Sequence, residues 1–579
     1  MKPNFKVSHL SHNIGLIFAL GVTAAFAQVT PPDAGSLSTT PVAPPAAPVR
    51  SPTFEVQQVV RPALVAPGGV KVKAVSFKVS GNTVFSDATL TALLGDLIGK
   101  DLDLSGLDQA AGIISQYYRE RGYFVARAYL PAQEISSGNL EIAVIEGRLG
   151  AIKFNRGAGT RLTDARAESL LAEAAPLGAP IREQNIERGL MLLNDLPGVE
   201  VKSTLIPGAT PGTSDLVIET TEGRMVTGSV DADNYGNKYT GALRFGATVN
   251  LNNPLGIGDQ LIVRGLTTGV GLKYGRLAYS APVGDMGTKL GVAFSKMDYK
   301  LGKDFSVLNA FGQSTVASIY AVQPFIRSRN NNLYGTLTLD SKRLSDDQVG
   351  INVTNKKIGV LAFGLSGDMR DAVGGGGLNA GSLTFTRGSL NVGGNANYAA
   401  NDALTARTAG EYSKINYNAS RLQRIDDSWS FYAGVSGQSA NKNLDSSEKF
   451  VLGGLGVRAY PQGEASGDSG MLVNLEARYT VPGFDFGQMQ VLGFIDTGSI
   501  TLHKTLYVGS QPVGLPGFPN SYNLSGFGIG LNIFKDGDFS VRTSLAKKLG
   551  SNPGRDILGR DSDGASNSMR FWVQLTKQF

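Results

Sequence analysis

The chain has 579 residues, 18% of them charged and 42% hydrophobic, so it is neither disordered nor uniformly apolar and is long enough for several domains. It contains no Cys, which excludes disulfides, a thiol nucleophile and Cys-based zinc sites. Three His residues and a net charge of +6 over this length exclude a His-rich metal centre and give no indication of nucleic-acid binding.

The first 27 residues have the pattern of a secretory signal peptide. Lys2 and Lys6 precede an apolar run at 14–25, and the tripeptide AFA at 25–27 has the small residues that signal peptidase accepts. The alternative, a membrane anchor, would need a longer apolar run. We therefore expect cleavage before Gln28 and export of the mature protein from the cytoplasm.

A Pro-rich segment follows the signal peptide. Nine Pro residues fall in the 40 positions from Gln28 to Pro67, a composition that favours extended, solvated backbone over a packed core. We interpret residues 28–69 as a linker. Whether a plug helix lies near Glu55 to Val60 is left open by the sequence.

Residues 70–147 form the first of two similar units. A strand begins the unit, because Val75, Phe77 and Val79 alternate with polar neighbours. A helix follows, and its expected buried face carries residues spaced by three and four: Leu107, Ala110, Ile114, Tyr117 and Arg121. Strands at 123–130 and 139–145 complete the unit.

Residues 148–223 repeat this order. We expect a strand at 149–154, helices near 164–173 and 184–193, and strands at 199–206 and 215–220. Both units end on the tripeptide Glu-Gly-Arg, at 146–148 and at 222–224. A repeat at this spacing indicates two copies of one small domain.

Two β-α-α-β-β units of this kind resemble the polypeptide-transport-associated (POTRA) domains of outer-membrane assembly and secretion proteins. The stretch IERGLMLLNDLPGVEVKSTLIPG at 186–208 is similar to the second such domain of two-partner secretion transporters. A small sheet with an exposed edge can bind an extended client strand through main-chain hydrogen bonds, which suits an unfolded passenger. The alternative role is that of a spacer.

Residues 224–579 differ from the preceding units in their pattern of apolar and polar residues, and this pattern predicts a membrane β-barrel. Helical periodicity disappears, and segments such as GALRFGATVNL at 241–251 and MLVNLEARYTV at 471–481 alternate apolar and polar residues. A soluble β-sandwich would also alternate, but its strands are usually shorter. Ten-residue segments with one apolar and one charged face fit a barrel with a water-filled lumen. The expected mature sequence contains no apolar run of 18 residues, so a membrane-spanning helix is not predicted.

The number of strands is open on length alone, since 14, 16 or 18 would fit. The resemblance to two-partner secretion transporters implies a C-terminal antiparallel transmembrane barrel of 16 strands. Phe579 ends an alternating strand, as expected for a C-terminal signal that the outer-membrane insertion machinery reads. An even count places Arg224 and Phe579 on the same, periplasmic side.

A candidate gate lies in the loop LGGLGVRAYPQGEASGDSG at 452–470, between two predicted strands on the extracellular side. It resembles the loop-tip signature of the Omp85 and two-partner secretion superfamily, here in the form Gly456, Val457, Arg458, Ala459 and Tyr460, with Ala459 in place of the usual Gly. The resemblance implies that this tip folds back into the barrel.

The partner motif lies on the next strand, where Phe494, Asp496 and Gly498 match the family's Phe-x-Asp-x-Gly element. Alternation places Phe494 and Asp496 in the lumen and Ile495 toward lipid. A guanidinium and a carboxylate can meet there in a bidentate pair, so Arg458 is predicted to act as a latch. The alternative is a solvated loop charge.

No pattern indicates an enzyme, a metal site or a cofactor. The segment GGGG at 374–377 is unlike a phosphate-binding loop, and His503, the one His of the mature chain, has no nucleophile pattern around it. The sequence therefore resembles the hemolysin secretion and activation family of two-partner secretion transporters, placed in the outer membrane of a Gram-negative bacterium with its POTRA domains in the periplasm.

The resemblance implies a pore that captures an unfolded exoprotein, such as a hemolysin or an adhesin, and passes it through the barrel. Other expected partners are outer-membrane lipid and, during biogenesis, the barrel assembly machinery and periplasmic chaperones, with no nucleic acid. The alternative functions are an Omp85-type assembly factor, which usually carries more POTRA units, and a plain diffusion porin, which needs none.

Overall fold

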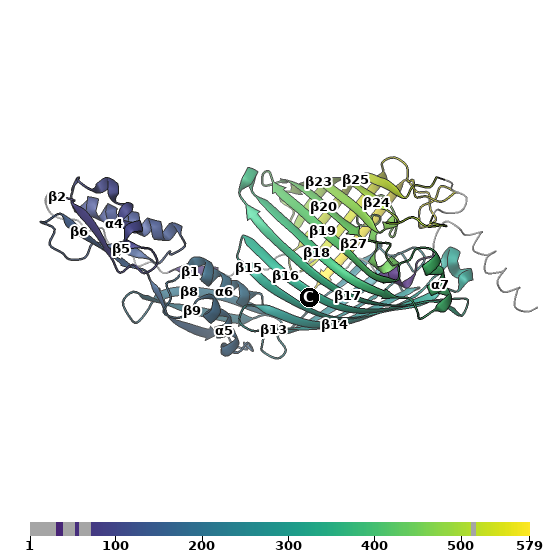
Figure 1. The fold of residues 1–579 in the computed structure, drawn as a ribbon, viewed down its shortest axis with the longest axis horizontal. Helices are drawn as coiled ribbons and strands as arrows, with labels where there is room; N and C mark the ends of the chain where they lie inside the picture. Colours follow the sequence, from purple (N-terminus) through teal and green to yellow (C-terminus); the bar gives the residue numbers. More distant parts are fainter. Residues whose placement is uncertain (1–30, 39–52, 57–70, 511–516) are drawn as a thin grey trace, which may run out of the picture.

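The computed structural model describes residues 31–38, 53–56, 71–510 and 517–579. Two small units lie in tandem at one end of a barrel, and the second of them contacts the barrel (Figure 1). The predicted signal peptide at 1–27 lies outside the described residues. Among the residues that are described, no helix is both long and apolar enough to cross a membrane.

The first unit is a three-stranded sheet covered by helices. β3 (Ser76–Ser80) pairs parallel with β6 (Asn139–Ile145), and β5 (Arg127–Tyr129) pairs antiparallel with β6. Its other elements are β2 (Val72–Lys73), α3 (Asp87–Ala92), η1 (Gly95–Leu97), β4 (Asp101–Leu102) and α4 (Leu104–Glu120). The Asp103 side chain caps α4 by accepting from the Gly106 amide at 2.8 Å. The predicted helix face is confirmed for Leu107, Ala110 and Ile114, whereas Tyr117 is half-buried and Arg121 is exposed beyond the end of α4. Val75 lies just before β3 and is 57% exposed.

The second unit has a sheet of order β1-β8-β9-β7. Its elements are β7 (Arg148–Arg156), α5 (Asp164–Ala174), α6 (Glu183–Asn194), β8 (Val199–Pro207) and β9 (Thr213–Glu222). The edge strand β1 (Thr53–Val56) comes from the segment that precedes both units, and it pairs parallel with β8.

The repeated glutamate has the same structural role in both units. Glu146 accepts hydrogen bonds from the amides of Thr83 (2.6 Å) and Val84 (2.7 Å), in the loop after the first strand. Glu222 does the same for the amides of Arg161 (3.0 Å) and Leu162 (2.7 Å). A buried carboxylate that satisfies two loop amides fixes the loop against the last strand, which explains why the tripeptide recurs.

The expectation of a solvated linker throughout residues 28–69 is wrong for two stretches. Ala34–Ser38 forms the short helix α2, which packs inside the barrel, and Thr53–Val56 forms β1. Five residues cannot form a stable helix alone, so its partners in the lumen must stabilise α2. Composition could not reveal this, because the stabilising groups lie hundreds of residues away.

The barrel closes with 16 antiparallel strands, which confirms the number implied by the resemblance. The strands are β10 (Val226–Asp233), β11 (Arg244–Asn252), β12 (Gln260–Thr267), β13 (Leu272–Val283), β14 (Thr288–Lys300), β15 (Phe311–Arg327), β16 (Asn331–Gln348), β17 (Ile351–Asp371), β18 (Gly377–Asn391), β19 (Gly410–Arg424), β20 (Trp429–Ala440), β23 (Ser469–Val481), β24 (Gln488–Thr501), β25 (Ser521–Lys535), β26 (Phe539–Lys548) and β27 (Met569–Gln578). Pairing of β10 with β27 closes the ring.

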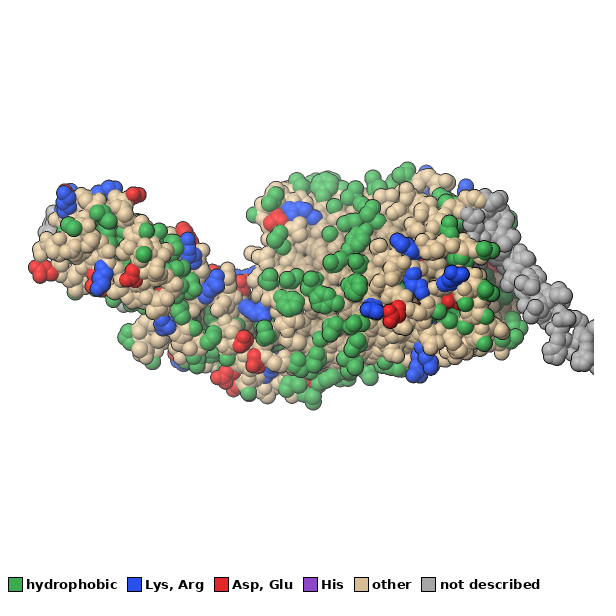
Figure 2. Space-filling model, in the orientation of Figure 1, with side chains coloured by type: hydrophobic (Ala, Val, Ile, Leu, Met, Phe, Trp, Pro, Cys, Tyr) green, Lys and Arg blue, Asp and Glu red, His purple; other side chains and the backbone are tan. Residues whose placement is uncertain are grey.

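Alternation along the barrel strands sorts side chains between lipid and lumen. On β24, Val491 and Ile495 are 45% and 52% exposed on the outer surface, whereas Phe494 and Asp496 are buried inside. Many hydrophobic side chains cover the part of the barrel surface nearer the small units (Figure 2). This is the pattern of a barrel in contact with lipid.

The second unit is fastened to the near end of the barrel through α6 and the residue that follows it. Asp195 accepts a bidentate pair of hydrogen bonds from Arg327 at 2.7 Å each, and Lys289 donates to the Asp195 carbonyl oxygen at 2.8 Å. Arg188 donates to the carbonyl oxygens of Pro324 (3.1 Å) and Phe325 (3.2 Å). These contacts lie at the ends of β14 and β15 and identify this end of the barrel as the one facing the small units.

Candidate gate in the barrel lumen

The loop between β20 and β23 folds into the barrel. At its base, β21 (Phe450–Val451) pairs with β22 (Ser466–Gly467), and the 3-10 turn η4 (Ser446–Glu448) precedes them. At its tip, Val457, Ala459 and Tyr460 are fully buried. The Tyr460 amide donates to the Val457 carbonyl oxygen at 3.0 Å, which tightens the turn that presents Arg458.

Arg458 joins this tip to the barrel wall. Its Nε and Nη2 donate to the two carboxylate oxygens of Asp496 at 2.8 and 2.7 Å, and its backbone amide donates to Asp496 Oδ2 at 3.1 Å. Its Nη1 donates to Glu476 Oε1 on β23 at 2.8 Å. The planar guanidinium thus satisfies one carboxylate in bidentate geometry and reaches a second.

Three further polar groups hold this pair in place. Asn474 Nδ2 donates to Asp496 Oδ1 (2.7 Å) and to the Gly456 carbonyl oxygen (3.0 Å). Trp572 Nε1 of β27 donates to the Arg458 carbonyl oxygen at 2.7 Å. Arg478 Nε donates to Glu476 Oε2 at 2.8 Å, so each carboxylate of the cluster has more than one donor.

The motif on β24 supplies a stacking surface and space as well as charge. The Arg458 guanidinium carbon lies 3.5 Å from the centre of the Phe494 ring, which is cation–π geometry. At Gly498, a Cβ atom would lie 2.5 Å from Leu452 Cδ2 of the loop. Phe494, Asp496 and Gly498 therefore each meet the loop in a different way.

Ala459 fits at the position where the signature named above implies Gly because the opposite wall provides room. Its backbone is not left-handed, so the position does not require Gly. It faces Gly526 of β25, where a Cβ atom would lie only 2.4 Å from Ala459 Cβ. Tyr460, next in the chain, has the Lys548 ammonium 5.1 Å from its ring centre.

Sequence reasoning missed the acidic residues that anchor the rest of the loop. Glu464 accepts from Asn552 Nδ2 and from the Ser562 amide, both at 2.7 Å. Asp468 accepts from the amides of Leu444 (3.0 Å) and Lys504 (2.8 Å). Two acidic residues in a loop of small residues were visible in the sequence, but apart from Leu444 their partners lie on other loops.

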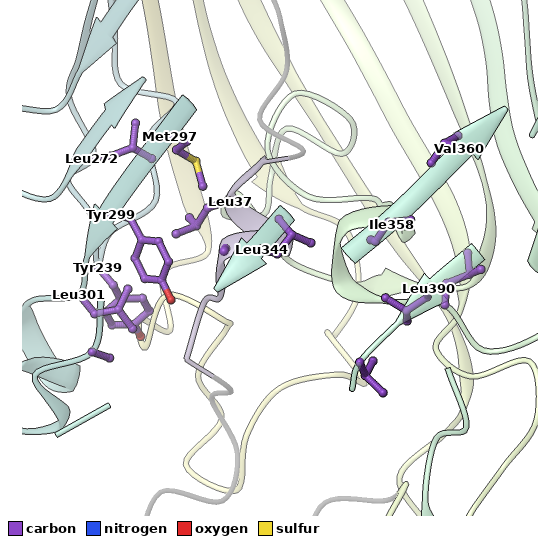
Figure 3. Close-up of a cluster of buried hydrophobic side chains, with 14 of the residues drawn as sticks. Leu37, Tyr239, Leu272, Met297, Tyr299, Leu301, Leu344, Ile358, Val360 and Leu390 are labelled. Atoms are coloured by element: carbon purple, nitrogen blue, oxygen red, sulfur yellow. The ribbon is translucent and has the colours of Figure 1, made fainter. Parts of the chain in front are cut away.

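The helix α2 fills another part of the lumen. Its first amide, that of Ala34, donates to Asp346 Oδ1 at 2.7 Å, and the preceding Asp33 lies 3.5 Å from the ammonium of Lys356. Leu37 packs in an apolar cluster with Tyr299 and other lumen side chains (Figure 3). The sequence left open whether a plug helix lies near residues 55–60. The helix described in the lumen is α2, residues 53–56 form β1, and residues 57–60 lie outside the described residues.

α2 and the inward loop meet. Ser446 Oγ of η4 donates to Asp33 Oδ2 at 2.6 Å, and Lys356 bridges Asp33 to Asp445 of the same loop, the latter at 2.7 Å. A cavity of about 720 Å³ remains between them and the wall, lined in part by Leu37, Arg264 and Ser466. The lumen is therefore narrowed by two segments that share an ion-pair network. In the described ranges, no group of three or more Asp, Glu or His side chains is placed to hold a metal ion.

The fold and this site define a class of protein, namely an outer-membrane translocation pore with POTRA domains and an inward-folded loop. Residues 212–533 match the family described as "Haemolysin secretion/activation protein ShlB/FhaC/HecB", and residues 72–147 match its ShlB-type POTRA domain. The chain therefore belongs to the haemolysin secretion/activation family of two-partner secretion transporters, as the motifs predicted.

Relatives cover most of the chain. "Heme/hemopexin transporter protein HuxB" of Haemophilus influenzae (strain 86-028NP) is 31% identical over 85% of this chain and 84% of its own. "Outer membrane transporter CdiB" of Dickeya dadantii is 25% identical over 73% and 75%. The solved structure of CdiB from Escherichia coli shares the fold, with a TM-score of 0.70 at 21% identity over 90% and 93% of the two chains.

These findings fix the location and the general function. The protein is an outer-membrane barrel whose POTRA domains lie in the periplasm, and it secretes a partner exoprotein through the membrane. The end of the barrel opposite the small units is accordingly extracellular.

Proposed function

We propose that the structure is the closed state of this secretion pore and that the pair Arg458–Asp496 is the latch that keeps the inward loop in the lumen. The observation that carries the proposal is the bidentate pair, whose carboxylate is fully buried and whose guanidinium belongs to the loop tip. Passage of an extended chain requires space that the loop and α2 occupy. Opening therefore requires both segments to move.

Client capture is proposed to occur in the two POTRA domains, which we delimit as residues 70–147 and 148–223, ahead of a barrel at 224–579. The first sheet ends at β5, an edge that a client strand can extend. In the second sheet, β1 occupies the β8 edge. A client that binds β8 must displace β1, which follows the lumen helix α2 in the chain.

The protein is a transporter without enzymatic activity, and it depends on outer-membrane lipid, the barrel assembly machinery and periplasmic chaperones. Phe579 is the proposed insertion signal. Its amide and carbonyl oxygen each pair with Gly228 at 3.0 Å, so the last residue takes part in closing the barrel seam.

The passenger is a secreted exoprotein of the hemolysin or adhesin type. Because one relative is named a heme/hemopexin transporter, haem and hemopexin binding by the secreted passenger deserve a direct test. The function is tested by comparing culture supernatants and outer membranes with and without this gene. Loss of one large secreted protein supports the proposal, whereas loss of many barrels from the outer membrane would favour an assembly factor.

A further inference from the structure

One wall of the barrel carries cations on its outward face, near the extracellular end. Arg343 of β16 lies directly opposite Lys357 of β17 in the strand register, and both side chains are exposed. Thr315 of β15 and Lys296 of β14 continue the same row. On the face seen in Figure 2, several Lys and Arg side chains gather on the part of the barrel away from the small units.

Among the described residues, no acidic side chain forms an ion pair with Arg343 or Lys357. Like charges directly opposite each other on adjacent strands repel and destabilise the pairing. Two neighbouring cations do have acidic partners: Arg387 lies 2.7 Å from Glu411, and Lys296 lies 3.2 Å from Asp298. Over the described ranges, neither Arg343 nor Lys357 takes part in an ion pair or a side-chain hydrogen bond. An anion supplied from outside the chain would relieve this repulsion.

The surroundings of the pair suit an amphiphile. On β15, β16 and β17, the outward positions two residues closer to the periplasm than the row of Thr315, Arg343 and Lys357 hold small residues. These are Ala317, Ser341 and Gly359. The next outward positions toward the periplasm hold Ile319, Leu339 and Leu361, whose side chains are 60%, 50% and 46% exposed. The cations therefore lie just beyond an apolar surface, separated from it by small side chains, and a Cβ atom at Gly359 would meet nothing within 4 Å.

Simple snorkelling of a basic side chain toward water does not require two cations in register. Lys547 of β26 illustrates that case, since its cross-strand neighbours on the outer face are the apolar Phe527 and Met569. The difference between the two walls indicates a ligand-specific arrangement at Arg343 and Lys357.

We propose that Arg343 and Lys357 bind the phosphate of a phosphorylated glycolipid in the outer leaflet of the outer membrane, with its acyl chains over Ile319, Leu339 and Leu361. Arg supplies planar, bidentate recognition of phosphate and Lys a compact charge, and Ser341 adds a hydroxyl beside them. Basic pockets beside apolar membrane surfaces recognise lipid headgroups in this way. The proposal requires only the membrane location of the barrel and not the identity of the passenger.

The test uses the full-length protein in nanodiscs of phosphatidylcholine, with diphosphoryl lipid A or its dephosphorylated form as the added lipid. Native mass spectrometry counts the lipid that each protein retains. We expect wild type to retain diphosphoryl lipid A and not the dephosphorylated form, and the double variant Arg343→Ala/Lys357→Ala to bind it about tenfold more weakly, because both charges are lost. Inorganic phosphate should not displace the lipid, since it lacks the apolar contacts.

Matched controls distinguish this site from general attraction. Lys547→Ala removes an outward cation from the other wall and should leave lipid retention unchanged, and Arg343→Lys/Lys357→Arg should keep most of it. Heat-dependent gel mobility verifies that each variant forms a barrel. Equal retention of both lipid forms by wild type overturns the proposal without any variant. So does an equal loss in Lys547→Ala, or displacement of the lipid by phosphate alone.

Discussion

At the scale of single residues, Arg458 joins the loop tip to the carboxylates of Asp496 and Glu476 on the barrel wall. Removing either partner leaves the charge of the other without its opposite charge. Such a change costs roughly 3 to 5 kcal/mol for fully buried pairs and less where lumen water screens the charge. We expect Arg458→Ala and Asp496→Ala each to reduce secretion, and the double variant to be little worse than either single variant. Passenger in culture supernatants, normalised to assembled barrel on gels, provides the measurement.

An exposed ion pair provides the matched control for the latch. Arg424, the last residue of β19, and Asp427, in the turn that follows, have side chains that are 62% and 93% exposed. Exposed pairs contribute about 0 to 1 kcal/mol, so Arg424→Ala should leave secretion unchanged. Fully additive defects at Arg458 and Asp496 would contradict the pairing and leave Arg458 as a solvated loop charge.

Glu146 provides a residue-scale prediction outside the membrane. Burial acts to raise its pKa, but hydrogen bonds from Thr83, Val84 and Tyr118 outweigh burial and lower it below the ordinary value of 4.5. A lowered folded-state pKa means that this stabilisation is present above about pH 4.5 and is lost as the pH falls through the folded-state pKa. We expect the protection of the Thr83 and Val84 amides against hydrogen exchange to fall on acidification.

Glu146→Gln should remove this pH dependence. The amide group keeps one acceptor and loses the charge, so protection at neutral pH should drop by roughly 1 to 3 kcal/mol and then change little with acid. The exposed Glu134→Gln variant serves as the control and should behave as wild type. Unchanged protection of the two amides in Glu146→Gln would show that other contacts hold this loop.

At the scale of elements, the alternation of apolar and polar residues along the strands gave the most detailed correct predictions. It placed Phe494 and Asp496 in the lumen and Ile495 toward lipid, because the two faces of a barrel strand meet different solvents. It could not identify Glu476, Asn474 and Trp572 as neighbours of Arg458, because these contacts depend on which strands pair and in what register. The α2 helix was missed for the related reason that its stability comes from Asp346 and Lys356 and not from its own sequence.

The strand β1 covers the β8 edge of the periplasmic sheet, and its displacement can be tested directly. Glu55 of β1 is in register with Thr204 of β8, and the chain has no Cys of its own. A disulfide in Glu55→Cys/Thr204→Cys would fix β1 on the β8 edge. We expect oxidised protein to secrete poorly, and reductant to restore secretion, since the client could then displace β1.

The single variant Glu55→Cys, treated with the same oxidant and reductant, is the control and should secrete normally in both states. Cross-linking is verified by non-reducing gel electrophoresis after proteolysis. Normal secretion by fully cross-linked protein would show that the client does not need the β8 edge and would leave β3, β5 or β7 as the edge that receives it.

At the scale of the whole molecule, the barrel and the periplasmic domains depend on different interactions. The barrel strands pair only with one another around a closed ring, whereas the first POTRA domain contacts the second through Phe124 and Val125 and through the bond from the Glu183 amide to the Gly122 carbonyl oxygen at 2.9 Å. Membrane insertion should therefore survive loss of the first domain. Capture should not, because the free β5 edge is lost with it.

Deletion of residues 70–147 tests this separation. We expect heat-modifiable barrel in the outer membrane at near wild-type amounts and passenger accumulating in the periplasm instead of the medium. Because the deletion also exposes the surface that Phe124 and Val125 covered, the double variant Phe124→Ser/Val125→Ser in the full chain measures that effect alone, and it should retain more secretion than the deletion. Normal secretion by the deleted protein would reject capture by the first domain and leave it as a spacer.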